Sequence, residues 1–247
     1  MLSIDRIASK LDEHLNRNDY AAAEQHLDYW MGEARLQGDG RALLFLCNEC
    51  IGLHRKLGRE QKALAACQAA LEQVQEMGIG ENIGAATTYL NAATAYKAFG
   101  RADQAIPLFE RAESIYRKAL PPQDARWGGL YNNMALALVD LKRFQEAKEC
   151  YQKALEITIA NDTKPEQAVT HLNLASAAES EYGLEAGERE IALRIGLAWE
   201  LLNDASLVQD GNYAFVCEKC APTFRYYGYF LYATQLEERA KEIYEGN

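Results

Sequence analysis

The pattern of hydrophobic and polar positions predicts a chain built from helices. In TTYLNAATAYKAFG (87–100) and LYNNMALALVDLKR (130–143), the apolar residues recur at spacings of three and four positions. That spacing places them on one face of an α-helix, which packs this face against its neighbours. No segment shows a sustained two-residue alternation enriched in β-branched residues, so we expect no β-sheet. The predicted fold class is all-α.

The helical segments repeat with a period of about forty residues. GREQKALAACQAALEQ (58–73), GRADQAIPLFERAESI (100–115) and KRFQEAKECYQKALEI (142–157) align without gaps. They share two alanines seven residues apart, namely Ala63 and Ala70, Ala105 and Ala112, and Ala147 and Ala154. A fixed internal period indicates a repeat architecture, and with the helix upstream each unit is predicted to be a helical hairpin. In the fifth unit Gly187 stands where alanine is expected, which leaves the register of its second helix open.

Loop-forming sequences separate the hairpins, because Gly, Pro, Asn and Asp favour turns. They are GDG (38–40), GIG (78–80), PPQD (121–124), NDTKP (161–165) and NDAS (203–206). Thr163 precedes Glu166 by three residues, which predicts a capping box at the start of the following helix. We expect one domain over residues 1–247, made of six hairpins at about 3–37, 41–77, 82–119, 124–160, 166–203 and 208–245.

Residues 131–159 show the repeat unit most completely. The unit has Tyr131, Met134, Ala135 and Leu138 on its first helix, Leu141 and Phe144 at its turn, and Ala147, Tyr151, Ala154 and Leu155 on its second helix. This pattern resembles the tetratricopeptide repeat, a helix-turn-helix unit. Lys142 occupies the position where Gly58 and Gly100 stand in the two preceding units. The resemblance implies a right-handed superhelical solenoid (an α-α superhelix) whose first helices line a concave, peptide-binding surface.

The period of 42 residues is longer than the common tetratricopeptide unit of about 34. It is similar to the longer units of kinesin light chains and of the peptide-pheromone receptors of Gram-positive bacteria.

The resemblance also implies which side chains face the groove. In the three central units, the residue before the large apolar position of the first helix is Asn91, Asn133 or Asn173. Because an asparagine amide both donates and accepts hydrogen bonds, it can hold the main chain of an extended peptide. Alternatively, these amides bond neighbouring helices without any ligand. The other groove positions implied by this register are Asn48, Arg55, Thr94, Lys97 and Asn132, of which the two cations favour a ligand with an acidic group.

Charge and hydropathy narrow the choice of partners. The chain has 26 Lys and Arg against 36 Asp and Glu, a net charge of -10. This excess of acid repels polyphosphates and anionic membranes, so we expect neither nucleic acid nor membrane as a partner. Charges interrupt the first fifteen residues, and no apolar run approaches the roughly eighteen residues of a spanning helix. We therefore expect a cytoplasmic protein.

Cysteines provide the one candidate metal site. Cys47, Cys50 and His54 share one face of a predicted helix, and Cys67 lies on the partner helix. Three thiolates and an imidazole are a ligand set that zinc accepts. The four positions are also core positions of the repeat, where thiols pack as small apolar side chains. We expect packing to be their role, and we expect no cofactor.

The remaining motifs favour binding over catalysis. The sequence holds no Gly-rich phosphate loop, no GxSxG elbow and no HExxH. The aromatic run FRYYGYFLY (224–232) either covers the open end of the array or forms a patch for a homodimer. We predict a non-catalytic module that holds an extended peptide or a partner protein in its concave groove. The alternatives are a peptide-sensing regulator related to the pheromone receptors but without a DNA-binding domain, and a zinc or catalytic protein that uses the cysteine set.

Overall fold

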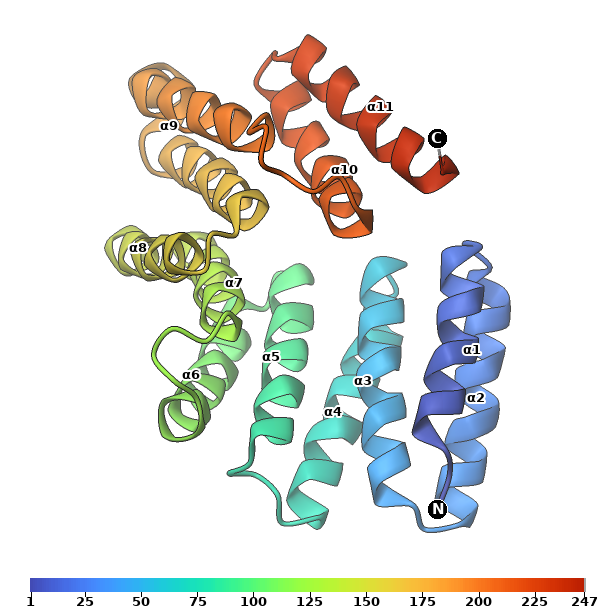
Figure 1. The fold of residues 1–247 in the computed structure, drawn as a ribbon. Coiled ribbons are helices and arrows are strands. Elements are labelled where there is room, and N and C mark those ends of the chain that lie inside the picture. The colour runs from blue at the N-terminus through green and yellow to red at the C-terminus, as the bar shows by residue number, and fades with distance from the viewer. Residues whose placement is uncertain (247) are drawn as a thin grey trace. The chain divides into compact units, whose positions relative to one another are not determined.

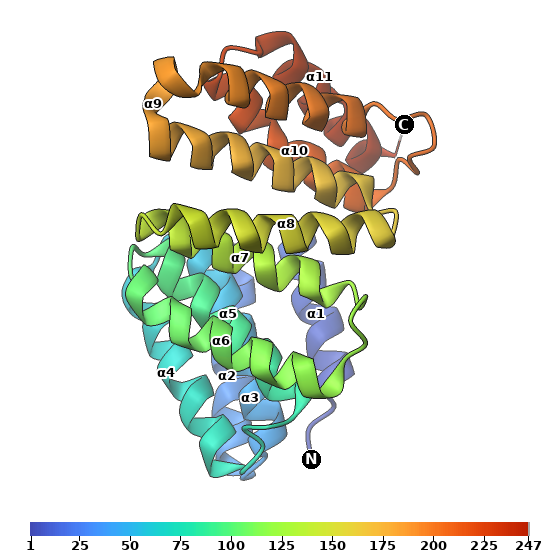
Figure 2. The same ribbon diagram turned by 90° about the vertical axis from the view of Figure 1, so that its left-hand side faces the viewer.

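The computed structural model describes residues 1–246, and within this range the chain has eleven helices and no β-strand (Figures 1 and 2). The helices are α1 (Ile4–Asn16), α2 (Tyr20–Leu36), α3 (Gly40–Lys56), α4 (Glu60–Glu76), α5 (Ile83–Ala98), α6 (Ala102–Ala119), α7 (Arg126–Asp140), α8 (Phe144–Ala160), α9 (Lys164–Leu202), α10 (Gly211–Tyr226) and α11 (Phe230–Glu245). Helix α9 is two helices joined at Gly183, whose φ of 80° and ψ of 167° are not helical. The described chain therefore holds six hairpins, and the predicted all-α repeat fold is confirmed.

The helices form two compact units. The first, Met1–Leu120, contains α1 to α6, and the second, which begins at Pro121, contains α7 to α11. Within the first unit α3 packs against α4 and α5 against α6, while α3 also contacts α5. Within the second unit α7 packs against α8 and α10 against α11, while α9 contacts α7, α8 and α10. The expected single array over both units stays a prediction.

Polar side chains cap several of the helix starts. The side chains of Asp19, Asp39, Asn82 and Asp210 each accept a hydrogen bond from the backbone N–H three residues later. The predicted capping box at Thr163 and Glu166 is wrong. The Thr163 hydroxyl donates instead to the backbone oxygen of Thr158 at 3.3 Å and makes no bond to the start of α9. The backbone N–H of Thr163 also donates to the Thr158 oxygen, at 2.9 Å, and not to the Glu166 carboxylate.

Left-handed residues close the turns inside the hairpins. Gly58 and Gly100 have φ angles of 65° and 73°, and Lys142 at the equivalent position has a φ of 60°. Glycine adopts this region without steric cost, whereas a residue with a Cβ is strained there. The lysine of the fourth hairpin therefore follows the same backbone path under strain.

Small residues lie where the two helices of a hairpin cross. The repeat alanines Ala63, Ala70, Ala105, Ala112, Ala147 and Ala154 are at most 1% exposed. In the fifth hairpin Gly187 takes this place, because a Cβ there would lie 3.3 Å from the backbone oxygen of Ala178. The close approach of the two halves of α9 thus depends on a residue without a side chain.

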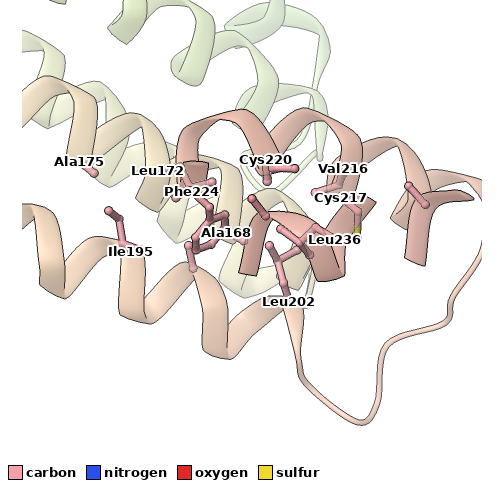
Figure 3. Close-up of a cluster of buried hydrophobic side chains, with 14 of the residues drawn as sticks. Ala168, Leu172, Ala175, Ile195, Leu202, Val216, Cys217, Cys220, Phe224 and Leu236 are labelled. Carbon is pink, nitrogen blue, oxygen red and sulfur yellow. The ribbon is translucent and has the colours of Figure 1, made fainter. Parts of the chain in front are cut away.

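The second unit buries an apolar cluster between α9, α10 and α11 (Figure 3). Leu172, Ile195, Phe224 and Leu236 are at most 3% exposed in it, and Cys217 and Cys220 lie among them. This cluster fixes α10 beside the first half of α9, and these two helices carry part of the candidate site.

Candidate functional site

Asparagine side chains connect the first helices of successive hairpins in the first unit. Asn48 on α3 donates its amide to the hydroxyl of Thr88 on α5 at 3.0 Å. Asn91 on α5 donates in turn to the side-chain oxygen of Asn48 at 2.9 Å. All three side chains are half-buried or buried. The bonds hold α3 and α5 in one register.

The second unit repeats this arrangement. Asn132 on α7 donates to the hydroxyl of Thr170 on α9 at 2.6 Å, and Asn173 donates to the side-chain oxygen of Asn132 at 3.2 Å. Of the three asparagines for which bonding to a neighbouring helix was the alternative, Asn91 and Asn173 therefore make such bonds, with Asn48 and Asn132 as their partners. The side-chain oxygen of Asn173 accepts no hydrogen bond from the residues that the structure describes, so it is still available to a ligand.

The other predicted groove residues make bonds only within their own helices or lie near helix ends. Asn133 donates to the backbone oxygen of Gly129 at 3.0 Å, and Thr94 donates to that of Leu90 at 2.8 Å. Arg55 is exposed in the last turn of α3, and Lys97 is half-buried in the last turn of α5. Of the eight predicted residues, three gather at one cleft, namely Asn132, Asn133 and Asn173.

This cleft lies entirely within the second unit and has a volume of about 360 Å³. Its walls come from α7, the end of α8, the first half of α9, and α10. Leu136, Ile157, Val169, Phe215 and Val216 give it an apolar surface between the polar groups. Binding sites for small ligands are concave and mostly apolar with a few placed polar groups, which is the character of this cleft.

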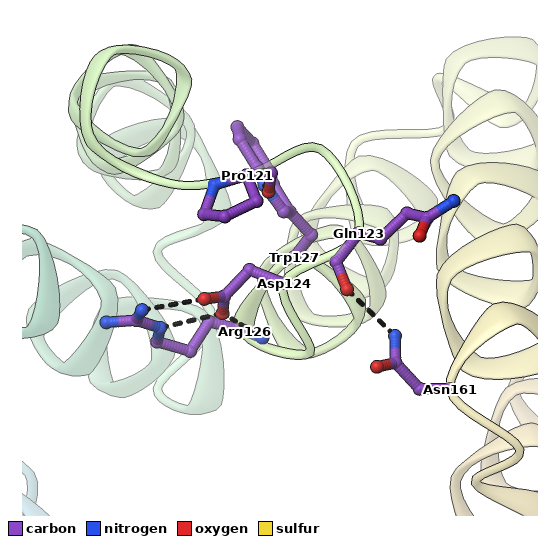
Figure 4. Close-up of polar contacts among 6 residues, drawn as sticks. All are labelled: Pro121, Gln123, Asp124, Arg126, Trp127 and Asn161. Atoms are coloured by element: carbon purple, nitrogen blue, oxygen red, sulfur yellow. Dashed lines mark hydrogen bonds and ion pairs between the residues drawn. The ribbon is translucent and has the colours of Figure 1, made fainter.

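The loop before α7 forms one rim of the cleft and is tied down by hydrogen bonds (Figure 4). Asn161, at the end of α8, donates to the backbone oxygen of Gln123 at 2.9 Å, and the Trp127 indole donates to that of Pro121 at 3.0 Å. The guanidinium of Arg126 bonds both carboxylate oxygens of Asp124. These contacts hold the loop in place beside Asn161, which itself lines the cleft.

The contribution of α10 to the cleft was not predicted from the sequence. Phe215 lines the cleft and is 57% exposed, which is a large exposure for an aromatic ring. It lies 42 residues after Asn173, so the repeat period applied once more would have assigned it to the groove. Glu166 and Lys219 line the same cleft and were also not predicted.

The candidate zinc residues, Cys47, Cys50, His54 and Cys67, are all buried. Within residues 1–246 no three His, Cys, Asp or Glu side chains are grouped so that they would hold an ion. Burial raises the pKa of the Cys47 thiol to about 11 and that of Cys50 and Cys67 to about 12. Burial likewise lowers the pKa of His54. Buried thiols pack as small apolar side chains, and the placement of these four residues gives no support to the zinc alternative.

The aromatic run at the C-terminal end packs mainly on its own unit. The ring of Tyr232 stacks on Trp199 with centroids 3.8 Å apart, and Phe224 is fully buried beneath them. This covers the core of the last hairpin. Phe230 and Leu231 remain 60% and 77% exposed at the start of α11.

No helix among the described residues is long and apolar enough to span a membrane.

Comparison with solved structures finds the same fold in distant proteins. BtubC (BKLC) from P. vanneervenii matches 94% of this chain and 91% of its own, with 20% identity and a TM-score of 0.58. A Podosopora anserina putative kinesin light chain with nearly identical TPR-like repeats matches 80% of this chain and 92% of its own, with 17% identity and a TM-score of 0.54. A substituted variant of that light chain gives a TM-score of 0.55 at the same identity.

Comparison with curated proteins finds no match. Comparison with protein families does: the tetratricopeptide repeat model matches residues 51–118 and 128–183. These ranges include all three of the segments whose alanines recur every 42 residues. The chain belongs to the tetratricopeptide repeat family.

Proposed function

We propose that this protein is a non-catalytic module that binds an extended segment of a partner protein. Tetratricopeptide repeats serve as scaffolds for interactions between proteins, and in this chain the first helices of the second unit leave an open cleft. The proposal assigns ligand contact to Asn132, Asn133 and Asn173.

One observation carries this proposal: the cleft combines unused amide oxygens with exposed apolar surface. Asn133 and Asn173 each donate one amide hydrogen to the protein, while their oxygens accept nothing from the described residues. An extended peptide offers backbone N–H groups, which can donate hydrogen bonds to such oxygens. Phe215 and Val169 offer apolar surface to a ligand side chain beside them. Backbone hydrogen bonds would hold the segment, and the apolar wall would select its side chain.

The first unit contributes a second part of the proposal. Asn48, Arg55, Asn91, Thr94 and Lys97 lie on its first helices α3 and α5. With Arg55 and Lys97 near the ends of these helices, a ligand bound here would carry an acidic group. A charge-assisted hydrogen bond to a guanidinium or ammonium is about twice as strong as a neutral one.

The chemistry of the cysteines supports a non-catalytic role. All six are buried, and burial raises the pKa of five of them, among them Cys220 to about 12. A thiol with a raised pKa and no access to solvent is a poor nucleophile. A peptide-sensing regulator would use the same cleft and differs only in the response that binding triggers.

A separate proposal concerns self-association through the last hairpin. Phe230 and Leu231 are adjacent, large, and mostly exposed, and Tyr226 beside them is 65% exposed. Aromatic residues concentrate at the centres of protein interfaces. Light scattering should then give a dimer for the wild type and a monomer for the Phe230→Ser, Leu231→Ser double variant. A wild type that is monomeric at all concentrations contradicts this proposal.

Fluorescence polarisation with a library of labelled, terminally capped decapeptides tests the binding function. We expect a subset of peptides to bind and Asn133→Ala to weaken them about two- to tenfold, the equivalent of one lost hydrogen bond. Asn16→Ala, an exposed change at the end of α1, is the matched control and should have no effect. If no peptide binds, or if both variants bind equally well, the proposed site is wrong.

A further inference from the structure

The cleft of the second unit has a negative charge at one end and a positive charge at the other. Three contacts show that α10 runs parallel to the first half of α9. Near the starts of both helices Asn212 contacts the Glu166 carboxylate at 3.5 Å. Near their ends Tyr226 and Tyr227 each donate to the Glu179 carboxylate at 2.6 Å. Residues that are equally far from the starts of the two helices therefore lie at the same height along the two parallel axes.

This parallel arrangement separates the two charges along the cleft. Glu166 lies level with Asn212, and Lys219 follows Asn212 by seven residues on α10. Seven residues rise by about 10 Å at about 1.5 Å per residue, so the positions of Glu166 and Lys219 differ by about 10 Å along the helix axes. An extended peptide advances about 3.3 Å per residue, so about three residues cover this separation.

Neither charge is neutralised by the protein. Glu166 and Lys219 form no ion pair within the described residues. By contrast, the neighbouring Lys164 pairs with Asp204 at 3.0 Å and donates to Ser206 at 2.7 Å. Glu166 is half-buried, so solvent screens its charge less than that of a fully exposed residue.

Apolar side chains occupy the space between the two charges. Val169, Phe215 and Val216 lie at intermediate positions along α9 and α10, and all three line the cleft. The charges and this apolar centre together define the ligand by complementarity.

We propose that the cleft binds an extended segment of a partner protein in which a basic and an acidic side chain flank a large apolar one. The basic side chain lies at Glu166, the acidic side chain lies at Lys219, and the two are about three or four residues apart in the segment. This inference rests on the proposed function, because it adds the charge pattern to a segment bound in the same cleft.

The test uses labelled, capped nonapeptides with a central leucine and two flanking residues that vary in charge. One set carries Lys and Glu in both orders, and the comparison sets carry two Lys, two Glu or two Gln. We expect one order of the mixed pair to bind about tenfold tighter than the Gln peptide in fluorescence polarisation. We expect Glu166→Gln and Lys219→Gln each to remove most of that advantage. Glu218→Gln, an exposed neighbour on α10 that does not line the cleft, should retain it.

A charge reversal completes the test. In the Lys219→Glu variant, the peptide with two Lys residues should become the tightest binder, because its second cation now meets a carboxylate. Equal binding of all five peptides overturns the charge inference but leaves the proposed peptide-binding function standing. If none of the peptides binds, including the Gln peptide, both the inference and the proposed function are contradicted.

Discussion

Asn173 on α9 donates its side-chain amide to the side-chain oxygen of Asn132 on α7 at 3.2 Å. Asn132 in turn donates its side-chain amide to the Thr170 hydroxyl at 2.6 Å, and Thr170 is fully buried. We expect Asn132→Ala to lower the free energy of unfolding of the second unit by about 1 to 3 kcal/mol, because two partners lose a bond at a half-buried site. Urea unfolding followed by circular dichroism measures the change.

Asn133 provides the matched comparison, because its amide bonds only a carbonyl of its own helix. Asn133→Ala should change the free energy of unfolding by less than about 0.5 kcal/mol. Equal losses for Asn132→Ala and Asn133→Ala would mean that the bond between α7 and α9 does not stabilise the unit.

Lys142 offers a stabilising substitution. Its φ of 60° is strained for a residue with a Cβ, whereas Gly58 and Gly100 adopt the same turn freely. We expect Lys142→Gly to raise the thermal midpoint, with a gain of about 0.5 to 1 kcal/mol after the greater flexibility of glycine in the unfolded chain is deducted. Gly58→Ala, the reverse change at an equivalent turn, should lower the midpoint. If Lys142→Gly lowered the thermal midpoint, the inference that Lys142 is strained would be contradicted.

Gly187 tests the close crossing inside α9. A Cβ at this position would lie 3.3 Å from the backbone oxygen of Ala178 and from a methyl carbon of Ile191. We expect Gly187→Val to destabilise the second unit by about 1 to 3 kcal/mol in urea unfolding. Gly196 lies in the same half of α9 with nothing within 4 Å of an added Cβ, so Gly196→Ala should be neutral or stabilising. If Gly187→Val and the wild type had the same urea midpoint of unfolding, the two halves of α9 would not cross as closely as inferred.

His171 gives the protein a dependence of stability on pH. Burial, reinforced by the nearby Arg194 guanidinium, lowers the pKa of His171 from its ordinary value of 6.5 to about 4. The unfolded chain then binds a proton between pH 6.5 and 4 that the folded chain does not, so stability falls as the pH is lowered through this window. We expect His171→Gln to lose less stability than the wild type between about pH 7 and 5, measured as thermal midpoints. Burial also lowers the pKa of His54, which adds a slope of the same sign to both proteins, and burial raises the pKa of Glu49, which adds one of the opposite sign to both.

An identical slope in His171→Gln and the wild type would contradict a half-buried, neutral His171. The carboxylates with a lowered pKa do not enter this comparison, and Glu49, whose pKa is raised by burial, is present in both proteins. Glu24, Asp124 and Asp204 have their pKa lowered to about 2 by hydrogen bonds from cations and neighbouring groups. The stability they contribute is lost only as the pH falls below their ordinary pKa values of 4.5 and 3.8, outside the window from about pH 7 to 5.

Much of the fold is predictable because the repeat imposes it on the sequence. The alanines at the helix crossings, such as Ala105 and Ala147, must be small for any pair of helices to approach, so they recur at a fixed period. Gly187 meets the same requirement for a small residue without matching the alanine pattern. Only the short distance between an added Cβ and the backbone oxygen of Ala178 shows this. Thr163 followed by Glu166 matched a capping pattern, but a carbonyl of the preceding helix competed for the hydroxyl.

The candidate site is less predictable, since it depends on how helices from different hairpins meet. The period places Asn132 and Asn173 on first helices, but whether their amides bond each other depends on side-chain orientation. Phe215 follows the period of the asparagines and was still missed, because an aromatic ring there looks like part of the core until its exposure is known. The free charges of Glu166 and Lys219 are visible only once the other ion pairs of the unit are in place.

Side-chain amide NMR of the protein with its tightest library peptide tests whether the cleft of the second unit receives the ligand through Asn133 and Asn173. We predict that the side-chain amide signals of these two residues, assigned with their Ala variants, shift on titration, while that of Asn16 on α1 does not. Saturable binding with no shift at Asn133 or Asn173 would contradict the account.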